Sequence, residues 1–368
     1  MNILCLINHA GKGGSEKYAA SMAQHCVSLG DRIFFIYNEP GPLVARMEAL
    51  SKDVTPLKLR SPMDFRAAKA LAEYCKANSI DLIHTHFARE NYICVLSKKL
   101  FANKAALIHT CHINTPNNRL WRIMNKFFMG ANDRVIAVCG SVKHLLIYNN
   151  YPADKIRLVY NGIPYRENVE KSKDPAKPFT FISLTRFSEE KGVFFLLESA
   201  KALMEKRSDF ALIIAGDGPL FKDAKEFKAQ NGLSGVVSLP GYCENAGELL
   251  AGADCFINSS SSEALSFAIL EAMEAGLPII ATNVGGNPEI VNEKTKSGLL
   301  VPYGNTKKMA AAMAAMPDSP DKVKEMAENA RRTVKEIFNM DNSIKTTYNI
   351  YLEVVRKHTK EAQNDNRR

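Results

Sequence analysis

Short apolar runs alternate with segments of helical periodicity along almost the whole chain. The apolar runs predict buried strands, and apolar residues spaced three or four apart predict amphipathic helices. The expected strands are Ile3–Ile7, Arg32–Tyr37, Leu82–His84, Ala106–His109, Val135–Val138, Phe179–Leu184, Ala211–Ala215, Val236–Leu239, Cys255–Ile257 and Pro278–Ala281. Helices expected between them include Ser15–Leu29, Phe65–Asn78, Val193–Glu205 and Ala268–Ala275. This alternation is typical of parallel sheets with helices on both faces, so we expect an α/β fold.

A polar, proline-containing stretch interrupts the alternation at residues 164–178, and it cannot contribute to a core. The strands on each side suffice for a sheet of their own. We therefore expect two doubly wound, Rossmann-like domains facing across a cleft, over residues 1–165 and 166–340, with ligands at the carboxyl ends of the strands. Residues 341–368 are expected to form a helix that packs back on the N-terminal domain, with a disordered tail from Lys357.

The composition suits a globular protein and excludes other classes. Hydrophobic residues make up 46% of the 368 residues, and no run approaches the roughly 18 apolar residues of a membrane span. The first residues do not resemble a secretory signal. The eight cysteines form no Cys-x-x-Cys pair and several lie in apolar runs, which favours buried thiols, a reducing cytoplasm and no zinc site.

The net charge of +9 is concentrated in the N-terminal half. Residues 1–165 hold 21 Lys and Arg against 11 Asp and Glu, whereas the remainder holds 27 against 28. Such an excess suits an anionic partner such as a membrane surface or a lipid pyrophosphate, and solubility explains it equally well. Nucleic-acid binding is the poorer interpretation because no recognition motif accompanies the charge.

The stretch Asn118–Asp133 has the pattern of an amphipathic basic helix. Its apolar side chains, Leu120, Trp121, Ile123, Met124, Phe127 and Phe128, are interleaved with Arg119, Arg122 and Lys126. Such a helix could lie on an anionic membrane, and a helix packed on the core with one solvated edge is an equal alternative.

Three loops that follow predicted strands carry candidate chemistry. The first, Asn8–Ser15, contains Gly11, Gly13 and Gly14 before a helix, where free backbone amides favour an anion, although a tight structural turn is the alternative. The second, Thr185–Gly192, places Arg186 and Lys191 five residues apart, so that the two cations can hold a diphosphate from two sides. Taken alone, this sequence is more typical of a charged surface loop that binds no ligand.

The third loop is the most informative. Ser259–Ser262 follow a strand, Glu263 comes next, and a helix is expected to begin near Ser266, which places Glu271 in its second turn. Two carboxylates near one helix start can bind sugar and ribose hydroxyls, while the amides of Ser266, Phe267 and Ala268 can bind phosphate oxygens. A capped structural helix is the alternative. Val284–Glu289, with Gly285 and Gly286, follows the next strand at the same edge of the sheet.

Taken in order, these motifs resemble those of retaining glycosyltransferases of family 4, which have the GT-B fold. The resemblance covers nearly the whole chain: Gly13-Gly14, Asn161-Gly162-Ile163, Thr185-Arg186-Phe187, Glu190-Lys191-Gly192, Ala215-Gly216-Asp217-Gly218-Pro219, the Glu263 and Glu271 pair, and Gly285-Gly286.

The resemblance implies a role for each candidate. Arg186 and Lys191 would neutralise the donor diphosphate, Glu263 would contact the transferred sugar, and Glu271 would hold the ribose. Gly13 and Gly14 would cover the phosphates, and the backbone at Gly241 and Tyr242 would bind the base. The family's active-site histidine maps to His112. The resemblance implies no metal and no other cofactor, because Arg and Lys replace the metal, and no Asp-x-Asp motif is present.

Two departures from the family pattern concern the sugar. Ala264-Leu265-Ser266 stands where the family often has Gly-Phe-Gly, so larger side chains narrow the space near the sugar. Ser259-Ser260 stands where Pro-Ser is common.

The reaction implied is transfer of a hexose or N-acetylhexosamine from a UDP-sugar, less readily a GDP-sugar, to a glycan or lipid-linked acceptor in capsule, O-antigen or lipopolysaccharide synthesis. A cytoplasmic enzyme, peripheral on the inner face of the membrane, would fit that acceptor. Two alternatives remain open: a nucleotide-sugar epimerase on the same fold, and a non-catalytic nucleotide-sugar-binding subunit.

Overall fold

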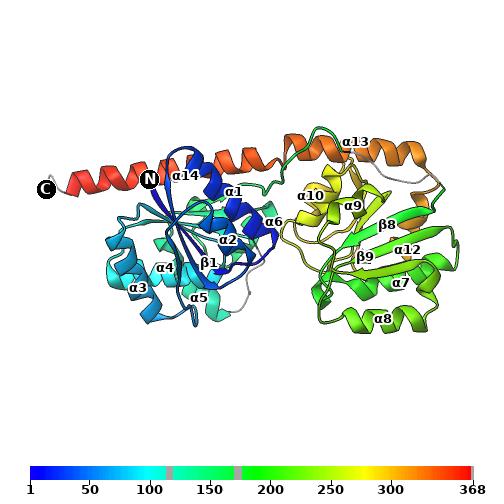
Figure 1. The fold of residues 1–368 in the computed structure, drawn as a ribbon, viewed down its shortest axis with the longest axis horizontal. Coiled ribbons are helices and arrows are strands. Elements are labelled where there is room, and N and C mark those ends of the chain that lie inside the picture. Colours follow the sequence, from blue (N-terminus) through cyan, green and yellow to red (C-terminus); the bar gives the residue numbers. More distant parts are fainter. Residues whose placement is uncertain (113–118, 170–175, 366–368) are drawn as a thin grey trace. The chain divides into compact units, whose positions relative to one another are not determined.

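The computed structural model describes residues 1–112, 119–169 and 176–365 (Figure 1). The chain divides into two compact units. The first consists of Met1–Asn161 and Met340–Arg368, and the second of Gly162–Asn339. The chain thus passes between the units slightly before the boundary expected at residue 165, and the last helix belongs with the first unit.

The first unit is a parallel sheet in the order β3-β2-β1-β4-β5-β6-β7. Its strands are β1 (Asn2–His9), β2 (Arg32–Glu39), β3 (Val54–Pro56), β4 (Leu82–Thr85), β5 (Ala106–Cys111), β6 (Arg134–Ala137) and β7 (Ile156–Leu158). Its α-helices are α1 (Gly14–Ser28), α2 (Pro42–Glu48), α3 (Phe65–Ala77), α4 (Ala88–Phe101), α5 (Arg119–Phe128), α6 (Gly140–Tyr148) and α14 (Met340–Asp365).

The second unit is a parallel sheet in the order β10-β9-β8-β11-β12-β13. Its strands are β8 (Phe179–Leu184), β9 (Phe210–Ala215), β10 (Val237–Gly241), β11 (Cys255–Asn258), β12 (Ile279–Thr282) and β13 (Gly298–Val301). Its α-helices are α7 (Val193–Met204), α8 (Phe221–Gln230), α9 (Ala246–Ala251), α10 (Phe267–Glu274), α11 (Asn287–Ile290), α12 (Thr306–Ala315) and α13 (Pro320–Glu336).

Three strands were not predicted, and all three are short edge strands. β3 and β7 end the sheet of the first unit, and β13 ends the sheet of the second. Each has only three or four residues and at least two that are not buried, so none forms the apolar run by which the central strands were found. The carboxyl ends of β8, β9, β10, β11 and β12 share one edge of the second sheet because these strands are parallel.

The final helix is anchored to the first unit by polar contacts as well as by its apolar side. The Tyr351 hydroxyl lies 2.5 Å from His84 Nδ1, and the Tyr348 hydroxyl donates to Asp31 Oδ2 at 2.8 Å. Further along the helix, His358 Nε2 lies 2.8 Å from Asp133 Oδ1. The expected disorder from Lys357 is therefore wrong as far as Asp365, because α14 continues through these residues.

The described cysteines are all free, and all are buried except Cys243, which is half-buried. None of the helices in the described ranges is long and apolar enough to cross a membrane.

Candidate active site

The basic loop after β8 is fixed to the second unit by a buried aromatic side chain. Phe187 is fully buried, and its ring meets that of Phe221 edge-on at 4.9 Å between centroids. Its backbone amide donates to the Asp217 carbonyl at 2.9 Å. The anchor leaves Arg186, on one side of Phe187, two-thirds exposed at the carboxyl edge of the sheet.

The basic loop and the serine loop after β11 are held together through their backbones. The Ser261 amide donates to the Glu190 carbonyl at 2.8 Å, and Ser259 Oγ donates to the Lys191 carbonyl at 3.0 Å. Gly192 has φ +63°, and a Cβ there would lie 2.1 Å from the Ser259 carbonyl oxygen, so only glycine permits this approach. The basic loop and the serine loop, which are far apart in the sequence, therefore form one surface.

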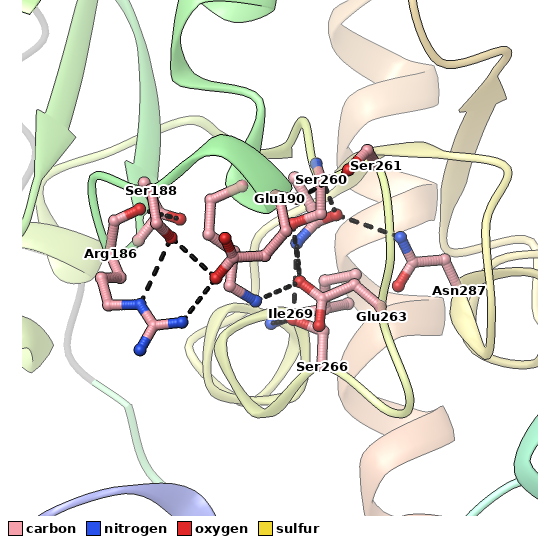
Figure 2. A network of polar contacts seen from close by, with 12 residues as sticks. Arg186, Ser188, Glu190, Ser260, Ser261, Glu263, Ser266, Ile269 and Asn287 are labelled. Atoms are coloured by element: carbon pink, nitrogen blue, oxygen red, sulfur yellow. Dashed lines mark hydrogen bonds and ion pairs between the residues drawn. The ribbon is translucent and has the colours of Figure 1, made fainter. Parts of the chain in front are cut away.

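Each cation of the basic loop is paired with a carboxylate (Figure 2). Arg186 Nη2 lies 2.5 Å from Glu190 Oε1, and Lys191 Nζ donates to Glu263 Oε1 at 2.8 Å. Partial burial raises the pKa of Glu190, but hydrogen bonds from Arg186 and Ser188 outweigh this effect and bring it to about 2. Both predicted cations and the first predicted carboxylate thus lie within one network.

The Glu263 carboxylate accepts hydrogen bonds from at least three donors among the described residues. Besides Lys191 Nζ, Glu263 Oε1 accepts from Ser260 Oγ at 2.6 Å and from Asn258 Nδ2 at 3.3 Å. Glu263 is 9% exposed and Ser260 1%, so these bonds are shielded from water. An ammonium and two neutral donors on one carboxylate oxygen fix the orientation of the Glu263 side chain.

A buried amide pair stands behind Glu263, and sequence reasoning missed it. Asn287 Nδ2 donates to Asn258 Oδ1 at 3.0 Å and to the Thr282 carbonyl at 3.0 Å (Figure 2). Asn258 is 7% exposed and Asn287 is fully buried. The signals in the sequence were a polar residue, Asn258, at the end of the apolar run of β11, and Asn287 at the start of α11, after the loop that follows β12.

The helix start predicted beside Glu263 is present. α10 begins at Phe267 with Ser266 as its N-cap, and Ser266 Oγ accepts from the Ile269 amide at 3.4 Å. Phe267, Ala268 and Glu271 are half-buried on its first turns. The first amides of the helix thus lie next to the Glu263 network, as an anion-binding site requires.

The side chains that replace the family's glycine pattern are buried. Ala264, Leu265 and Ser266 are at most 9% exposed, and the Ser266 hydroxyl serves the helix cap.

The candidate base-binding backbone lies at the end of β10, with Gly241 as the last residue of the strand and Tyr242 after it. Gly241 has φ +88°, and its carbonyl accepts from the Gly216 amide at 2.8 Å, which ties it to the end of β9. Tyr242 is 61% exposed.

Two of the residues predicted in the first unit, Gly13 and Gly14, lie at the start of α1. The Gly13 backbone caps α1, and a Cβ on Gly13 would lie 2.6 Å from Glu16 Oε2. The carboxylate of Glu16, which is buried, therefore lies directly over the glycine loop. The sequence did not single out Glu16.

His112 lies at the end of β5 and is buried. Its Nε2 is 3.1 Å from His86 Nδ1, and its Nδ1 is 3.3 Å from Asn161 Nδ2. Burial lowers the pKa of His112 well below its ordinary value, and the neighbouring His86 and His109 add to the effect. His112 is therefore a neutral imidazole at physiological pH. No group of three or more potential metal ligands occurs among the described residues.

Comparison with known proteins agrees with this arrangement. A sequence model described as Glycosyltransferase Family 4 matches residues 12–167, and one described as Glycosyl transferases group 1 matches residues 165–333. The chain belongs to the family 4 glycosyltransferases. The predicted family is thus confirmed, and this glycosyltransferase is an enzyme of the hexosyltransferase class.

Curated relatives align over most of the glycosyltransferase. N-acetyl-alpha-D-glucosaminyl L-malate synthase of Bacillus anthracis is 28% identical over 94% of this chain and 95% of its own length. UDP-Gal:alpha-D-GlcNAc-diphosphoundecaprenol alpha-1,3-galactosyltransferase of Escherichia coli is 24% identical over 88% of this chain and 89% of its own.

Solved structures confirm the predicted GT-B fold. A glycosyltransferase from Rickettsia africae superposes with a TM-score of 0.82 at 23% identity, over 96% of this chain and 98% of that one. HepE of Anabaena, solved in complex with UDP, superposes with a TM-score of 0.83 at 18% identity, over 96% and 100%.

Because the Gly285 backbone lies against the backbone of Glu263, we expect a side chain at position 285 to destabilise the fold. Gly285 has φ +54°, and a Cβ there would lie 1.7 Å from the Glu263 carbonyl oxygen. We expect Gly285→Ala to destabilise the second unit by roughly 2–4 kcal/mol, because backbone strain adds to a clash with backbone. Gly232→Ala is the control, since φ is +69° there but nothing lies within 4 Å. Its expected cost in denaturant unfolding is about 1 kcal/mol; equal losses for the two variants would contradict the clash.

Because Asn258 donates to Glu263, we expect substitutions of these two residues to have coupled effects on kcat. Asn258→Leu removes a donor to Glu263, and we expect kcat to fall about tenfold because the carboxylate loses its fixed orientation. In a Glu263→Ala background, which lacks the acceptor oxygen, the same change should cost nothing further. Asn329→Leu, at an equally buried asparagine of the second unit, is the control and should leave kcat unchanged. Additive losses in the double variant would show that Asn258 acts on the fold alone.

Proposed function

We propose that the enzyme transfers a hexose or N-acetylhexosamine from a UDP-sugar, with retention of configuration, to a glycan or lipid-linked acceptor in the synthesis of a cell-surface polysaccharide. The observation that carries the proposal is the joined pair of loops in the second unit. It places Arg186, Lys191 and Glu263 in one network beside the first turn of α10. Two cations, a helix start and a buried carboxylate match the parts of a nucleotide-sugar: a diphosphate and a sugar.

We assign each of these residues to a different part of the donor. In the proposed complex, Arg186 and Lys191 exchange their carboxylate partners for diphosphate oxygens and stabilise the charge of the leaving group. Glu263 keeps Ser260 and Asn258 as donors and contacts the transferred sugar. Glu271 holds the ribose, the amides of Ser266, Phe267 and Ala268 bind phosphate, and Gly241 and Tyr242 lie against the base. On the strength of the family resemblance, Gly13 and Gly14 remain predicted donor contacts, and His112 remains the predicted active-site histidine.

The names of relatives support a UDP-sugar and a polysaccharide product. The galactosyltransferase of Escherichia coli has a UDP-Gal donor in its name, and a structure of HepE contains UDP-glucose. Other relatives are named for colanic acid and amylovoran biosynthesis. The proposal includes lipopolysaccharide among the possible products, with the enzyme acting at the cytoplasmic face of the membrane.

We further propose that no metal or other cofactor takes part, because two basic side chains already reach the proposed diphosphate position. Turnover should then survive EDTA.

A donor panel tests the proposed function. Purified enzyme is incubated with UDP-glucose, UDP-galactose, UDP-N-acetylglucosamine and the GDP-sugars, and released nucleotide and free sugar are measured, with NMR of the anomeric proton of the product. We expect slow UDP release from at least one UDP-sugar and an α-product from an α-linked donor. Conversion of one UDP-sugar into another without UDP release would favour the epimerase. Tight binding without turnover would favour the non-catalytic subunit.

A further inference from the structure

Two buried histidines meet at the carboxyl ends of neighbouring strands in the first unit. His86 directly follows β4, and His112 directly follows β5, which pairs with β4 in parallel. The two rings are 17° from parallel, and their centroids are 5.4 Å apart. This separation is close to the largest that the 3.1 Å contact between His86 Nδ1 and His112 Nε2 allows. The contact therefore lies in the planes of both rings, where a ring N–H and a lone pair point.

Aromatic side chains pack against both rings and hold them in place. Tyr18 meets the His86 and His112 rings edge-on, with centroids 6.4 Å and 5.6 Å away. Tyr18 is itself buried, and its hydroxyl lies 2.6 Å from Thr347 Oγ1 on α14. The His84 ring lies 4.2 Å from the His86 ring, measured between centroids. Neither His86 nor His112 can turn in so close-packed a setting without displacing its neighbours.

The partners of His112 determine which of its ring nitrogens carries the proton. Burial lowers the pKa of His112 well below its ordinary value, so the ring is neutral and has a single N–H. Asn161 Nδ2 is a donor and lies 3.3 Å from His112 Nδ1, so His112 Nδ1 accepts and is unprotonated. The proton of His112 is therefore on Nε2, which donates to His86 Nδ1.

The contacts on the far side of the His86 ring agree with this assignment. Burial lowers the pKa of His86 to about 3, so this ring is also neutral. Because its Nδ1 accepts from His112, its proton is on Nε2, which lies 3.6 Å from Cys5 Sγ. Burial raises the pKa of the Cys5 thiol to about 12, so the sulfur is not ionised and acts as a weak acceptor. From Asn161 through both histidines to Cys5, each group thus donates to the next.

His112 is the most exposed of these four side chains, at 9%, and it lies at the carboxyl edge of the sheet, where open α/β sheets bind ligands. We propose that His86 is a positioning residue that holds His112 in the Nε2-protonated tautomer, so that His112 Nδ1 accepts from a substrate hydroxyl in place of Asn161. The contact with a substrate hydroxyl rests on the proposed function, whereas the tautomer does not.

Long-range ¹H–¹⁵N NMR of the full-length enzyme labelled at histidine shows which ring nitrogen carries the proton, and it needs neither donor nor acceptor. We expect wild-type His112 to be protonated on Nε2 at neutral pH. In His86→Leu the ratio of the Nε2-protonated to the Nδ1-protonated form should fall by about tenfold, because a buried N–H without an acceptor is unfavourable. His86→Asn should restore the wild-type ratio, since the asparagine Oδ1 can take the place of the histidine Nδ1.

Turnover of a UDP-sugar, with water in place of the acceptor, tests whether this tautomer matters to the reaction. We expect His86→Leu to lower kcat about tenfold with the affinity for UDP unchanged, and His86→Asn to recover most of the loss. In a His112→Asn background, His86→Leu should cost nothing further, because position 112 no longer has two tautomers. A weaker affinity of His86→Leu for the UDP-sugar would place the hydroxyl on the donor, and an unchanged affinity would place it on the acceptor.

His109→Leu is the matched control, because His109 is as buried as His86 but its Nδ1 lies 3.0 Å from Thr85 Oγ1. It should leave the His112 tautomer and kcat unchanged, and thermal unfolding confirms that each variant folds. The proposal is overturned if wild-type His112 is protonated on Nδ1, if His86→Leu leaves the tautomer as it is, or if the tautomer changes and kcat does not. If no UDP-sugar is turned over, the proposed function fails, while the NMR result still decides whether His86 sets the tautomer of His112.

Discussion

Glu263→Gln is expected to lower kcat for sugar transfer by about 10²–10³-fold while the enzyme stays folded. Glutamine has the same shape, and its carbonyl oxygen can still accept from Ser260 Oγ and Asn258 Nδ2. The substitution therefore removes the negative charge beside the transferred sugar without opening a cavity. It also releases Lys191 from its carboxylate partner, so affinity for UDP should be unchanged or higher.

Steady-state turnover of the donor and UDP calorimetry separate these effects. Glu226→Gln is the control, because Glu226 lies on the exposed side of α8 and pairs only loosely with Lys222, at 3.9 Å. A Glu263→Gln enzyme with wild-type kcat would remove Glu263 from the reaction. A variant that loses UDP binding in proportion to turnover would assign Glu263 to the nucleotide instead.

Arg186→Ala is expected to weaken UDP binding by about tenfold to a hundredfold, because a diphosphate loses a charge-assisted, bidentate partner. The side chain is two-thirds exposed, and its partner Glu190 keeps a hydrogen bond from Ser188 Oγ at 2.7 Å. Little stability should be lost, since an exposed ion pair contributes about 0–1 kcal/mol. Lys191→Ala should weaken UDP binding similarly, but it also leaves the buried Glu263 carboxylate without its cation and so destabilises the fold.

Uridine has no phosphate, so its affinity distinguishes the loss of a diphosphate contact from a general loss of nucleotide binding. Calorimetry should show a loss of affinity for UDP and none for uridine, and the salt dependence of UDP binding should decrease. Lys201→Ala removes an exposed cation from α7 and is the control. Equal losses for UDP and uridine would contradict the assignment of Arg186 to the phosphates.

The central strands and the site loops of the second unit were predictable because they carry local signals. β8 begins and ends where the apolar run does, and α10 starts after Ser266, a residue suited to an N-cap. The edge strands β3, β7 and β13 were missed because a half-exposed strand of three or four residues lacks such a run. α14 continues beyond the predicted helical end, where His358 binds Asp133, the residue before β6; this contact joins distant parts of the chain.

The partners of the site residues required the three-dimensional structure. Arg186, Lys191 and Glu263 were predicted from their residue types and positions after strands. Their immediate partners were not, because Asn287 and Asn258 are distant in the chain and meet only where β11 and β12 end side by side. Similarly, the amphipathic character of α5 was visible in the sequence, whereas its rotation, which buries Asn125 and exposes Leu120 and Phe127, was not.

The assignment of the second unit as the donor site is tested most directly by a crystal structure of the enzyme with UDP. We predict diphosphate oxygens about 3 Å from Lys191 Nζ and the Arg186 guanidinium, ribose hydroxyls on Glu271, and Glu263 still bound by Ser260 and Asn258. UDP bound elsewhere, with the Arg186–Glu190 and Lys191–Glu263 pairs unchanged, would contradict it.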